Sequence, residues 1–352
     1  MDKYSREVTL LKSVLTSIPI YQNTILLAPK NFINKVDSLL RRFLWERGKN
    51  NERRLHLVSW DKIKKPFSEG GLQIRDIAAQ NLALGAKLLW NLVSGRSSWS
   101  KRVMWKKYFQ GTRTRCLDQS PRAIKGSPIF KLYLTALEHF KANLYWIPGN
   151  GKNIRIWDDP ILGDSPLGQR EDLANIKIWL QNRNLKTLWD ISSWTEDEEE
   201  SWESWNMGDI PDLLEGETRC LIDLLQGKAP LKSQAKDKRG WGFTSGSYSV
   251  AEGYRLIKAI PNVPPDPSQW NFVWSATSIP KIDFFCWTLA HNNVLTSDNL
   301  RKRGMEGPSR CPLCVSEEEN ADHLLLNCSF AREIWKDTLK IDSNSFIIPG
   351  NI

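Results

Sequence analysis

The sequence has 352 residues, 41% hydrophobic and 25% charged, which is typical of a globular chain long enough for two or three domains. Its longest apolar region, from Leu10 to Ala28, is interrupted by polar residues and Pro19, so we expect neither a membrane span nor a secretory signal. With only six cysteines and no export signal, a reducing compartment is expected.

The net charge of +9 is distributed unevenly along the chain. Residues 1–150 carry 27 Lys and Arg against 10 Asp and Glu, whereas residues 151–230 carry 8 against 17. An excess of +17 is the electrostatic pattern of a protein that binds a phosphate backbone, with a solvated basic surface as the alternative. The residues predicted to contact nucleic acid are Arg41, Arg42, Arg53, Arg54, Lys62, Lys64, Lys65, Lys101, Arg102, Lys106 and Lys107.

The first segment is predicted to be helical. Apolar residues at helical spacing predict a helix that begins near Ser5 and ends at Pro19, and a second helix from Asn31 to Leu44. Residues 55–60 are predicted to be a short strand or an extended segment. A longer helix is expected from Asp76 to Val93, because apolar residues recur along it and Gly95 follows.

The middle of the chain carries signals for turns. Gly149-Asn150-Gly151 between two short apolar runs predicts a β-hairpin, and residues 240–250 predict a second hairpin around Thr244-Ser245-Gly246. The acidic run Glu196–Glu200 is expected to be a solvated linker or the start of a helix.

After the second turn the chain is again predicted to be helical. A helix is expected through Tyr254 and Ile257, then a proline-rich connector over residues 261–267, short buried helices, and a last helix from Ser329 to Leu339. The predicted fold class is therefore α+β and mostly α-helical, with a basic helical first region, small β-hairpins and a C-terminal helical domain that contains Cys311, Cys314, His323 and Cys328. The predicted domains are residues 1–144, 145–230 and 231–345.

Four candidate metal ligands lie close together near the end of the sequence. Cys311, Cys314, His323 and Cys328 form the pattern C-x2-C-x8-H-x4-C. Zn²⁺ prefers four nitrogen or sulfur ligands in a tetrahedron, and a set made entirely of protein side chains is typical of a structural site. Ordinary cysteines beside a core histidine are the alternative. We predict one structural Zn²⁺ here.

The order of several motifs resembles the C-terminal part of plant LINE-type (non-LTR retrotransposon) reverse transcriptases, and the resemblance covers nearly the whole chain. Three segments are similar to the thumb region and its continuation: LLKSVLTSIPIY, DSLLRRFLW and LVSWDKIKKPFSEGGLQIRD. Four later segments are similar to the zinc-binding domain and its lead-in: GNGKNIRIWDDPI, WGFTSGSYSVAEGY, WSATSIPKIDFFCW and CPLCVSEEENADHLLLNC. The sequence departs from the family at Pro160, where a second tryptophan is more usual.

The resemblance implies that Cys311, Cys314, His323 and Cys328 bind the metal. It also implies an element that copies RNA into DNA in the nucleus, with the cytoplasm as the alternative compartment. We expect RNA, single-stranded DNA or an RNA–DNA duplex as partners, no membrane, and the remaining polymerase segments as a partner in trans.

No catalytic residue is predicted. Reverse transcription needs palm carboxylates that hold Mg²⁺, but the only adjacent aspartates, Asp158 and Asp159, lie in the predicted hairpin with Arg155 where an aromatic residue would precede them. Endonuclease, ribonuclease H, P-loop and nucleophile-elbow signatures are not found in the sequence either. The expectation is a non-catalytic fragment or remnant of an RNA-directed DNA polymerase.

The predicted function is thus the binding of zinc and of an RNA template or template–primer, without strong sequence preference. The alternative is a host-retained protein–protein interaction module built on the structural zinc domain. Some of the 17 tryptophans are candidates for stacking on bases, but the sequence does not say which.

Overall fold

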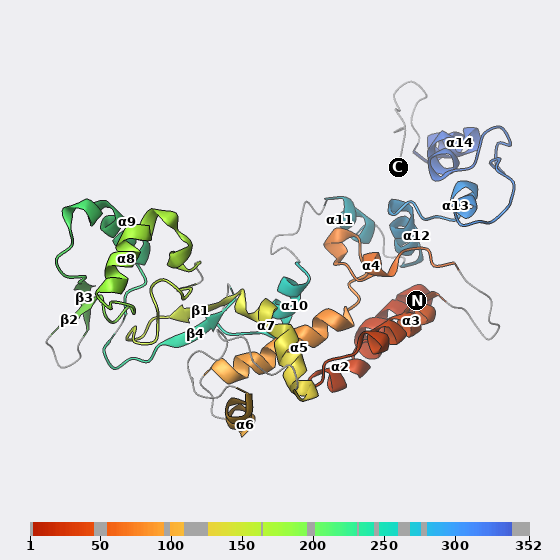
Figure 1. The fold of residues 1–352 in the computed structure, drawn as a ribbon. Helices are drawn as coiled ribbons and strands as arrows, with labels where there is room; N and C mark the ends of the chain where they lie inside the picture. Colours follow the sequence, from red (N-terminus) through yellow and green to blue (C-terminus); the bar gives the residue numbers. More distant parts are fainter. Residues whose placement is uncertain are drawn as a thin grey trace. The chain divides into compact units, whose positions relative to one another are not determined.

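The computed structural model describes residues 3–45, 55–94, 99–108, 126–162, 165–195, 201–230, 232–242, 246–259, 268–275 and 280–339. These residues are mostly helical and include two small antiparallel sheets, which confirms the predicted fold class (Figure 1). None of the helices in the described ranges combines the length and the apolar character that crossing a bilayer requires.

The chain forms two compact units that do not follow the order of the sequence. Unit 1 consists of residues 1–19, 29–77 and 260–352, and unit 2 of residues 20–28 and 78–259. Most of residues 1–77 and the C-terminal region therefore share unit 1, whereas the rest of the basic first region belongs to unit 2. The division into three consecutive domains stays a prediction from the sequence.

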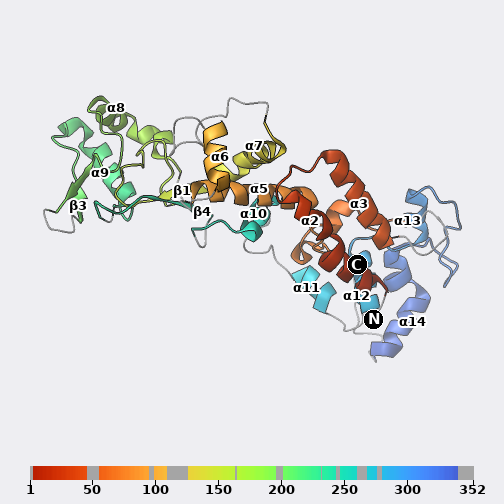
Figure 2. The ribbon, with the colours of Figure 1, turned by 90° about the horizontal axis from the view of Figure 1, so that it is seen from below.

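The helices of unit 1 come from both ends of the chain. They are α1 (Lys3–Leu10), which continues into a π-helical turn (Leu11–Leu15), α3 (Lys30–Trp45), α4 (Trp60–Ile63), α11 (Ser268–Ser275), α12 (Pro280–Ala290), α13 (Ser297–Lys302) and α14 (Ser329–Leu339). Helix α1 packs beside α3 and α12 (Figures 1 and 2). The first helical run ends at Leu15, before Pro19, but a helix that was not predicted, α2 (Ile18–Asn23), follows and contains Pro19 in its first turn. Proline is tolerated in a first helical turn because the N–H groups there have no intrahelical partner.

The core of unit 1 joins the two ends of the sequence. Leu11, Ile63 and Ile74 are buried together with Trp287 from α12. The Trp287 indole N–H donates to the carbonyl oxygen of Gly70 at 2.7 Å, and His291 Nε2 lies 2.8 Å from the same oxygen. Gly70 has φ +76°, and a Cβ there would lie 2.4 Å from the Trp270 ring, so only glycine fits this turn.

Unit 2 contains the remaining helices and all four strands. These are α5 (Ile77–Val93), α6 (Trp99–Tyr108), α7 (Pro128–Lys141), α8 (Ala174–Asn182), α9 (Glu215–Leu225), α10 (Val250–Ile257), β1 (Leu144–Ile147), β2 (Ser192–Trp194), β3 (Trp202–Trp205) and β4 (Lys238–Trp241). One apolar cluster joins α5, α6 and α7 to Trp241 and Tyr248. A second cluster joins α8 and α9 to the segment that follows β1.

The first predicted hairpin was wrong, because the strand that pairs with β1 is β4, and the chain that follows β1 meets it in an isolated parallel bridge between Trp146 and Ile161. The β1–β4 pairing is antiparallel, with Leu144 opposite Trp241 and Ile147 opposite Lys238. The Gly-Asn-Gly turn has another partner: the N–H groups of Gly149 and Gly151 donate to Asp237 Oδ1 at 2.8 and 2.7 Å. Asp237 directly precedes β4, so this turn places β4 against β1.

The second predicted hairpin was also wrong, because β4 pairs with β1 and the predicted second strand leads into a helix. Residues 238–241 form β4, but Ser249 begins helix α10, and its Oγ accepts a hydrogen bond from Glu252 N at 3.1 Å. This N-cap turns the second predicted strand into a helix start, since a capping serine favours helix over strand. Thr244 and Ser245 lie outside the described residues.

Two short strands flank the acidic run. Strands β2 and β3 pair in antiparallel register, with Ser192 opposite Trp205. Trp194 packs on Trp189 with ring centroids 4.7 Å apart, and Trp202 packs on Trp205 within β3 at 5.3 Å. The acidic run Glu196–Glu200 lies outside the described residues, so its assignment as a linker or helix start stays a prediction.

Candidate metal centre

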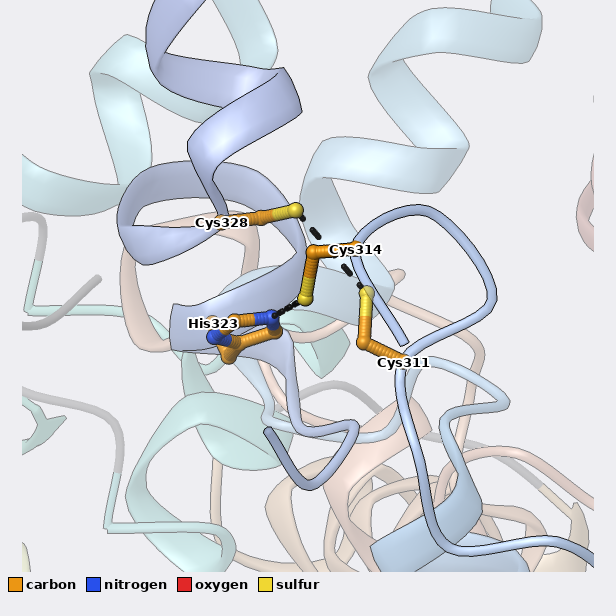
Figure 3. A group of neighbouring side chains, drawn as sticks. All are labelled: Cys311, Cys314, His323 and Cys328. Carbon is orange, nitrogen blue, oxygen red and sulfur yellow. Dashed lines mark hydrogen bonds between the residues drawn. The ribbon is translucent and has the colours of Figure 1, made fainter. Parts of the chain in front are cut away.

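The four predicted ligands meet in one place, just before helix α14. Cys311 and Cys314 come from a loop, whereas His323 and Cys328 lie at the two ends of a π-helical turn (His323–Asn327) (Figure 3). Their ligand atoms all lie within 4.8 Å of one another. Cys311, His323 and Cys328 are buried, and Cys314 is half-buried.

The donor set fits a tetrahedral zinc ion. With Zn–S near 2.3 Å and Zn–N near 2.0 Å, sulfur atoms in a tetrahedron are about 3.8 Å apart and sulfur and nitrogen about 3.5 Å apart. Here the Cys311 and Cys328 sulfurs are 3.9 Å apart, and Cys314 Sγ lies 3.2 Å from His323 Nε2. The three thiols are free, and the four donors are all protein atoms, which is the arrangement of a closed structural site.

The loop prepares its sulfurs for metal binding. Hydrogen bonds from the backbone N–H groups of Glu317 and Ser316 lower the pKa of the Cys314 thiol to about 6. Burial raises the pKa of Cys311, even though the N–H groups of Cys314 and Leu313 point at its sulfur. A buried thiolate needs a nearby positive charge, and a divalent cation between the four donors supplies it.

The loop is closed by its own backbone. Cys311 N donates to Glu317 O at 2.8 Å, and Val315 N donates to Cys311 O at 2.9 Å. To make this turn, Val315 adopts φ +58°, which is a left-handed conformation that costs energy for a β-branched residue. This conformational cost must be offset by other contacts of the loop, and a metal ion bound by Cys311 and Cys314 would provide them.

Sequence reasoning missed a carboxylate beside the histidine. Glu317 Oε2 lies 3.0 Å from His323 Nδ1, but no hydrogen bond joins the two groups. The Glu317 side chain is 70% exposed, so it has room to move, whereas the His323 ring is only 6% exposed. An acidic residue between the second cysteine and the histidine was the available signal.

The loop that carries Cys311 and Cys314, called the metal loop here and extending to Glu319, is attached to helix α13. Ser297 Oγ donates to Glu319 Oε2 at 2.6 Å, and Asp298 N donates to Glu319 O. Just after α13, the Arg303 guanidinium donates to the carbonyl oxygens of His56 and Leu57, both at 3.2 Å. These bonds connect the metal loop to the first part of the chain within unit 1.

The predicted nucleic-acid contacts of unit 1 have different environments. Arg42, Lys62 and Lys65 are exposed, and Lys65 pairs with Glu69 at 3.2 Å. Arg41 is half-buried and lines a groove of about 700 Å³ together with His56 and Arg303. Arg53 and Arg54 lie outside the described residues.

Lys64 is placed unlike the other predicted contacts. Its side chain is only 8% exposed, and its ammonium lies 2.7 Å from Asp37 and 3.6 Å from Asp76. An ammonium held between two carboxylates stabilises the fold and has little surface left for a phosphate. Lys64 is therefore a poor candidate for a phosphate contact.

The other predicted contacts lie on helix α6 of unit 2. Arg102, Lys106 and Lys107 are exposed, and the side chain of Lys101 lies outside the described residues. The structure therefore places the basic residues on two units, and no single surface common to all of them is defined.

The adjacent aspartates belong to a turn. Asp159 is buried, and its Oδ2 accepts a hydrogen bond from Arg155 N at 2.7 Å, while Asp158 pairs with the Arg155 side chain at 3.4 Å. Burial raises the pKa of Asp159. Both carboxylates thus have structural partners inside the turn.

Two curated plant proteins are similar to this chain. One, from Arabidopsis thaliana and described as a putative ribonuclease H protein, is 27% identical over 345 residues, which cover 94% of this chain and 52% of the relative. The other, an uncharacterized mitochondrial protein of Arabidopsis thaliana, is 24% identical over 153 residues, covering 43% of this chain and 97% of the relative. The chain thus spans about half the length of the first relative.

A family model agrees with the geometry of the metal centre. Residues 248–335 match the family described as zinc-binding in reverse transcriptase. The matched range contains Cys311, Cys314, His323 and Cys328, which are the residues that converge in the structure. Residues 248–335 are thus similar to the zinc-binding domain of reverse transcriptases.

Proposed function

We propose that this chain is a zinc-binding and nucleic-acid-binding part of a LINE-type, retrotransposon-derived reverse transcriptase, and that it binds without catalysing a reaction. The observation that carries the proposal is the closed Cys311, Cys314, His323 and Cys328 set inside residues that match the reverse transcriptase zinc-binding family. The match to the putative ribonuclease H protein over nearly the whole chain supports the same origin.

The zinc ion has a structural role in this proposal. When bound, it supplies a positive charge that four protein donors share, and no ligand position stays open for water. The cysteine thiolates and the imidazole fix the 311–317 loop against the start of α14. The zinc therefore holds the end of unit 1 in its folded form.

The basic first segment supplies most of the affinity for nucleic acid. Its excess of 27 basic over 10 acidic residues favours phosphate contacts, which carry little sequence information. Arg41, Arg42, Lys62 and Lys65 contribute from unit 1, and α6 contributes from unit 2. The natural ligands are the RNA template or a template–primer, and the compartment is the nucleus.

The absence of catalysis in this span is part of the proposal. Among the described residues, the only convergence of three or more metal-ligating side chains is the Cys3His set, and no group of carboxylates suited to Mg²⁺ accompanies it. Asp158 and Asp159 are engaged with Arg155. Primer extension by the purified chain is expected to be blank, and measurable extension would contradict this part.

The zinc is tested by elemental analysis of the purified chain. About one zinc per chain is expected. The double variant Cys311→Ser, Cys314→Ser is expected to lose it, because only two of the four ligands that a tetrahedral zinc site needs remain. Cys220→Ser is the matched control, since Cys220 is a free cysteine of unit 2 and is not one of the four clustered residues, which belong to unit 1. Unchanged zinc content in the double variant contradicts the site.

Nucleic-acid binding is tested by titration with labelled RNA at several salt concentrations. Affinity is expected to fall steeply between about 50 mM and about 200 mM salt, because bound cations are released when Lys and Arg contact phosphates. Undetectable binding at low salt, or binding that does not respond to salt, contradicts the proposal.

A protein partner is the second candidate function, and one observation favours it. Leu313 and Val315 in the metal loop, and Phe330 and Ile334 on α14, are 45%, 61%, 47% and 49% exposed. Exposed apolar side chains of this kind are frequent at protein interfaces. Capture of partners from nuclear extract distinguishes the two functions: a partner retained after nuclease treatment favours this one.

A further inference from the structure

Trp99 differs from the other described tryptophans in its exposure. It is 78% exposed, whereas Trp335, the next most exposed, is at 38% and donates its indole N–H to Leu325 O at 2.7 Å. A tryptophan side chain gains more from burial than almost any other residue, because it removes a large apolar area from water. An indole held outside the core in this way is available for a ligand.

Helix α6 holds Trp99 outward because its opposite face is anchored. Met104 is buried, and the Tyr108 ring stacks on Phe130 with centroids 3.9 Å apart and planes 8° apart. At 100° per residue, Trp99 and Lys106 lie on the side of the helix away from these anchors. Figure 2 shows α6 beside α5 and α7, the helices to which the anchors attach it.

The outward face is also strongly basic. Helix α6 has the sequence WSKRVMWKKY, with four basic residues and no acidic residue. The Arg102 guanidinium lies over the Trp99 ring, 5.1 Å from its centroid. No carboxylate of another described residue pairs with Arg102, Lys106 or Lys107. An exposed ring with a guanidinium beside it, on a helix that carries two further exposed lysines, is complementary to a base and its flanking phosphates.

We propose that the outer face of α6 binds single-stranded nucleic acid, with an unpaired base stacked on Trp99 and the neighbouring phosphates held by Arg102, Lys106 and Lys107. The inference rests on the proposed nucleic-acid binding and refines its ligand class. In a duplex the base faces are already stacked on one another, whereas an unpaired base offers its whole face to an indole. Arg102 extends the platform, because a guanidinium also stacks on aromatic rings.

The test compares Trp99→Ala with the unchanged chain, using a labelled oligouridylate of about 12 nucleotides, its abasic counterpart and an RNA duplex of matched charge. Loss of the indole is expected to weaken oligouridylate binding about 5- to 100-fold, with duplex binding unchanged. Trp99→Phe is expected to retain most of the affinity. Val103→Ala is the control, since Val103 is 54% exposed on the same helix without an aromatic face.

Salt dependence separates stacking from charge. Stacking releases no counterions, so Trp99→Ala is expected to leave the slope of log affinity against log salt unchanged. Arg102→Gln and Lys106→Gln are each expected to reduce that slope by about 0.7. Equal thermal melting of all variants excludes unfolding as the cause.

The outcomes distinguish this inference from the broader proposal. If the unchanged chain binds oligouridylate but Trp99→Ala binds it equally well, or loses duplex binding to the same extent, the stacking site is wrong and the phosphate-binding proposal stands. Equal binding of the abasic oligonucleotide has the same meaning. If the unchanged chain binds no nucleic acid, both are overturned.

Discussion

At the residue scale, Glu317 is placed to orient the metal-binding histidine. His323 directs Nε2 toward Cys314 Sγ and Nδ1 toward Glu317 Oε2, which is the relation of a carboxylate to a zinc-ligating imidazole. We expect Glu317→Ala to weaken zinc binding about 10- to 100-fold, because the imidazole loses the carboxylate that lies 3.0 Å from Nδ1 and favours the tautomer with Nε2 free for the metal. Competition with a chromophoric zinc chelator measures this change.

Two further variants show whether Glu317 acts through its position. Glu317→Gln keeps an acceptor without the charge, so an intermediate zinc affinity is expected. Glu306→Ala removes an exposed carboxylate outside the loop and is expected to have no effect. If Glu317→Ala and Glu306→Ala bind zinc with equal affinity, Glu317 has no role at the site.

Val315 gives a second prediction at this scale. Its φ of +58° is costly for a β-branched residue but not for glycine, and its side chain is 61% exposed, so little packing is lost on truncation. Val315→Gly is expected to stabilise the folded loop by about 1 kcal/mol, seen as zinc affinity raised several-fold. Val315→Ala keeps the strained Cβ and should give little of this gain; an equal gain from both variants would show that strain is not the cause.

At the scale of elements, Asn81 of α5 holds the end of α2. It is 1% exposed, accepts a hydrogen bond from Ala28 N at 2.9 Å, and donates to Asn23 O at 2.6 Å and Leu26 O at 2.9 Å. We expect Asn81→Ala to lower the free energy of opening of residues 23–28 by about 2–4 kcal/mol, because three backbone groups lose their partner. Amide hydrogen exchange measures this locally.

The control for Asn81 lies on the same helix. Asn91 is exposed, so Asn91→Ala is expected to change the exchange of residues 23–28 by less than about 0.5 kcal/mol. Asn81→Asp retains the acceptor for Ala28 N but not the two donors, and an intermediate loss is expected. Faster exchange in Asn91→Ala to the same degree would show that helix propensity, and not the Asn81 bonds, sets the effect.

The elements that the sequence predicts well are those defined by local patterns. Apolar spacing predicted α5 and α14 to within about one residue, because helical hydrogen bonds join residues close in sequence. The pairing of β1 with β4 was missed, because it depends on Asp237, far along the chain, accepting the N–H groups of Gly149 and Gly151. A glycine-rich turn looks the same in sequence whether it closes a hairpin or surrounds a distant carboxylate.

At the scale of the whole molecule, sites made of residues close in sequence could be predicted, whereas those that depend on distant residues could not. The four metal ligands were recognisable because they lie within 18 residues, and the structure brings them together. Lys64 was not distinguishable from an exposed lysine, because its partners Asp37 and Asp76 come from other parts of the chain. Trp99 was one of 17 tryptophans until its exposure was known.

Removal of zinc is expected to have a local effect, because the metal module, which consists of residues 311–331, has almost no hydrophobic core of its own. Its buried apolar cluster consists of Cys311, Cys328 and Ala331, so two of its three members are ligands. The clusters of unit 2 share no residue with it. A module this small depends on its metal, since structural zinc contributes on the order of 10 kcal/mol of apparent binding energy.

Chelation should therefore raise amide exchange at Cys311, Glu319 and Cys328, whose N–H groups are bonded within or beside the loop, and leave β1 and β4 protected. Helix α13 is expected to lose part of its protection, because Ser297 and Asp298 are bonded to Glu319. Added zinc should restore all three amides. Exchange that rises equally in unit 2 would show that the metal supports the entire fold, and exchange that rises nowhere would show that the 311–328 loop folds without it.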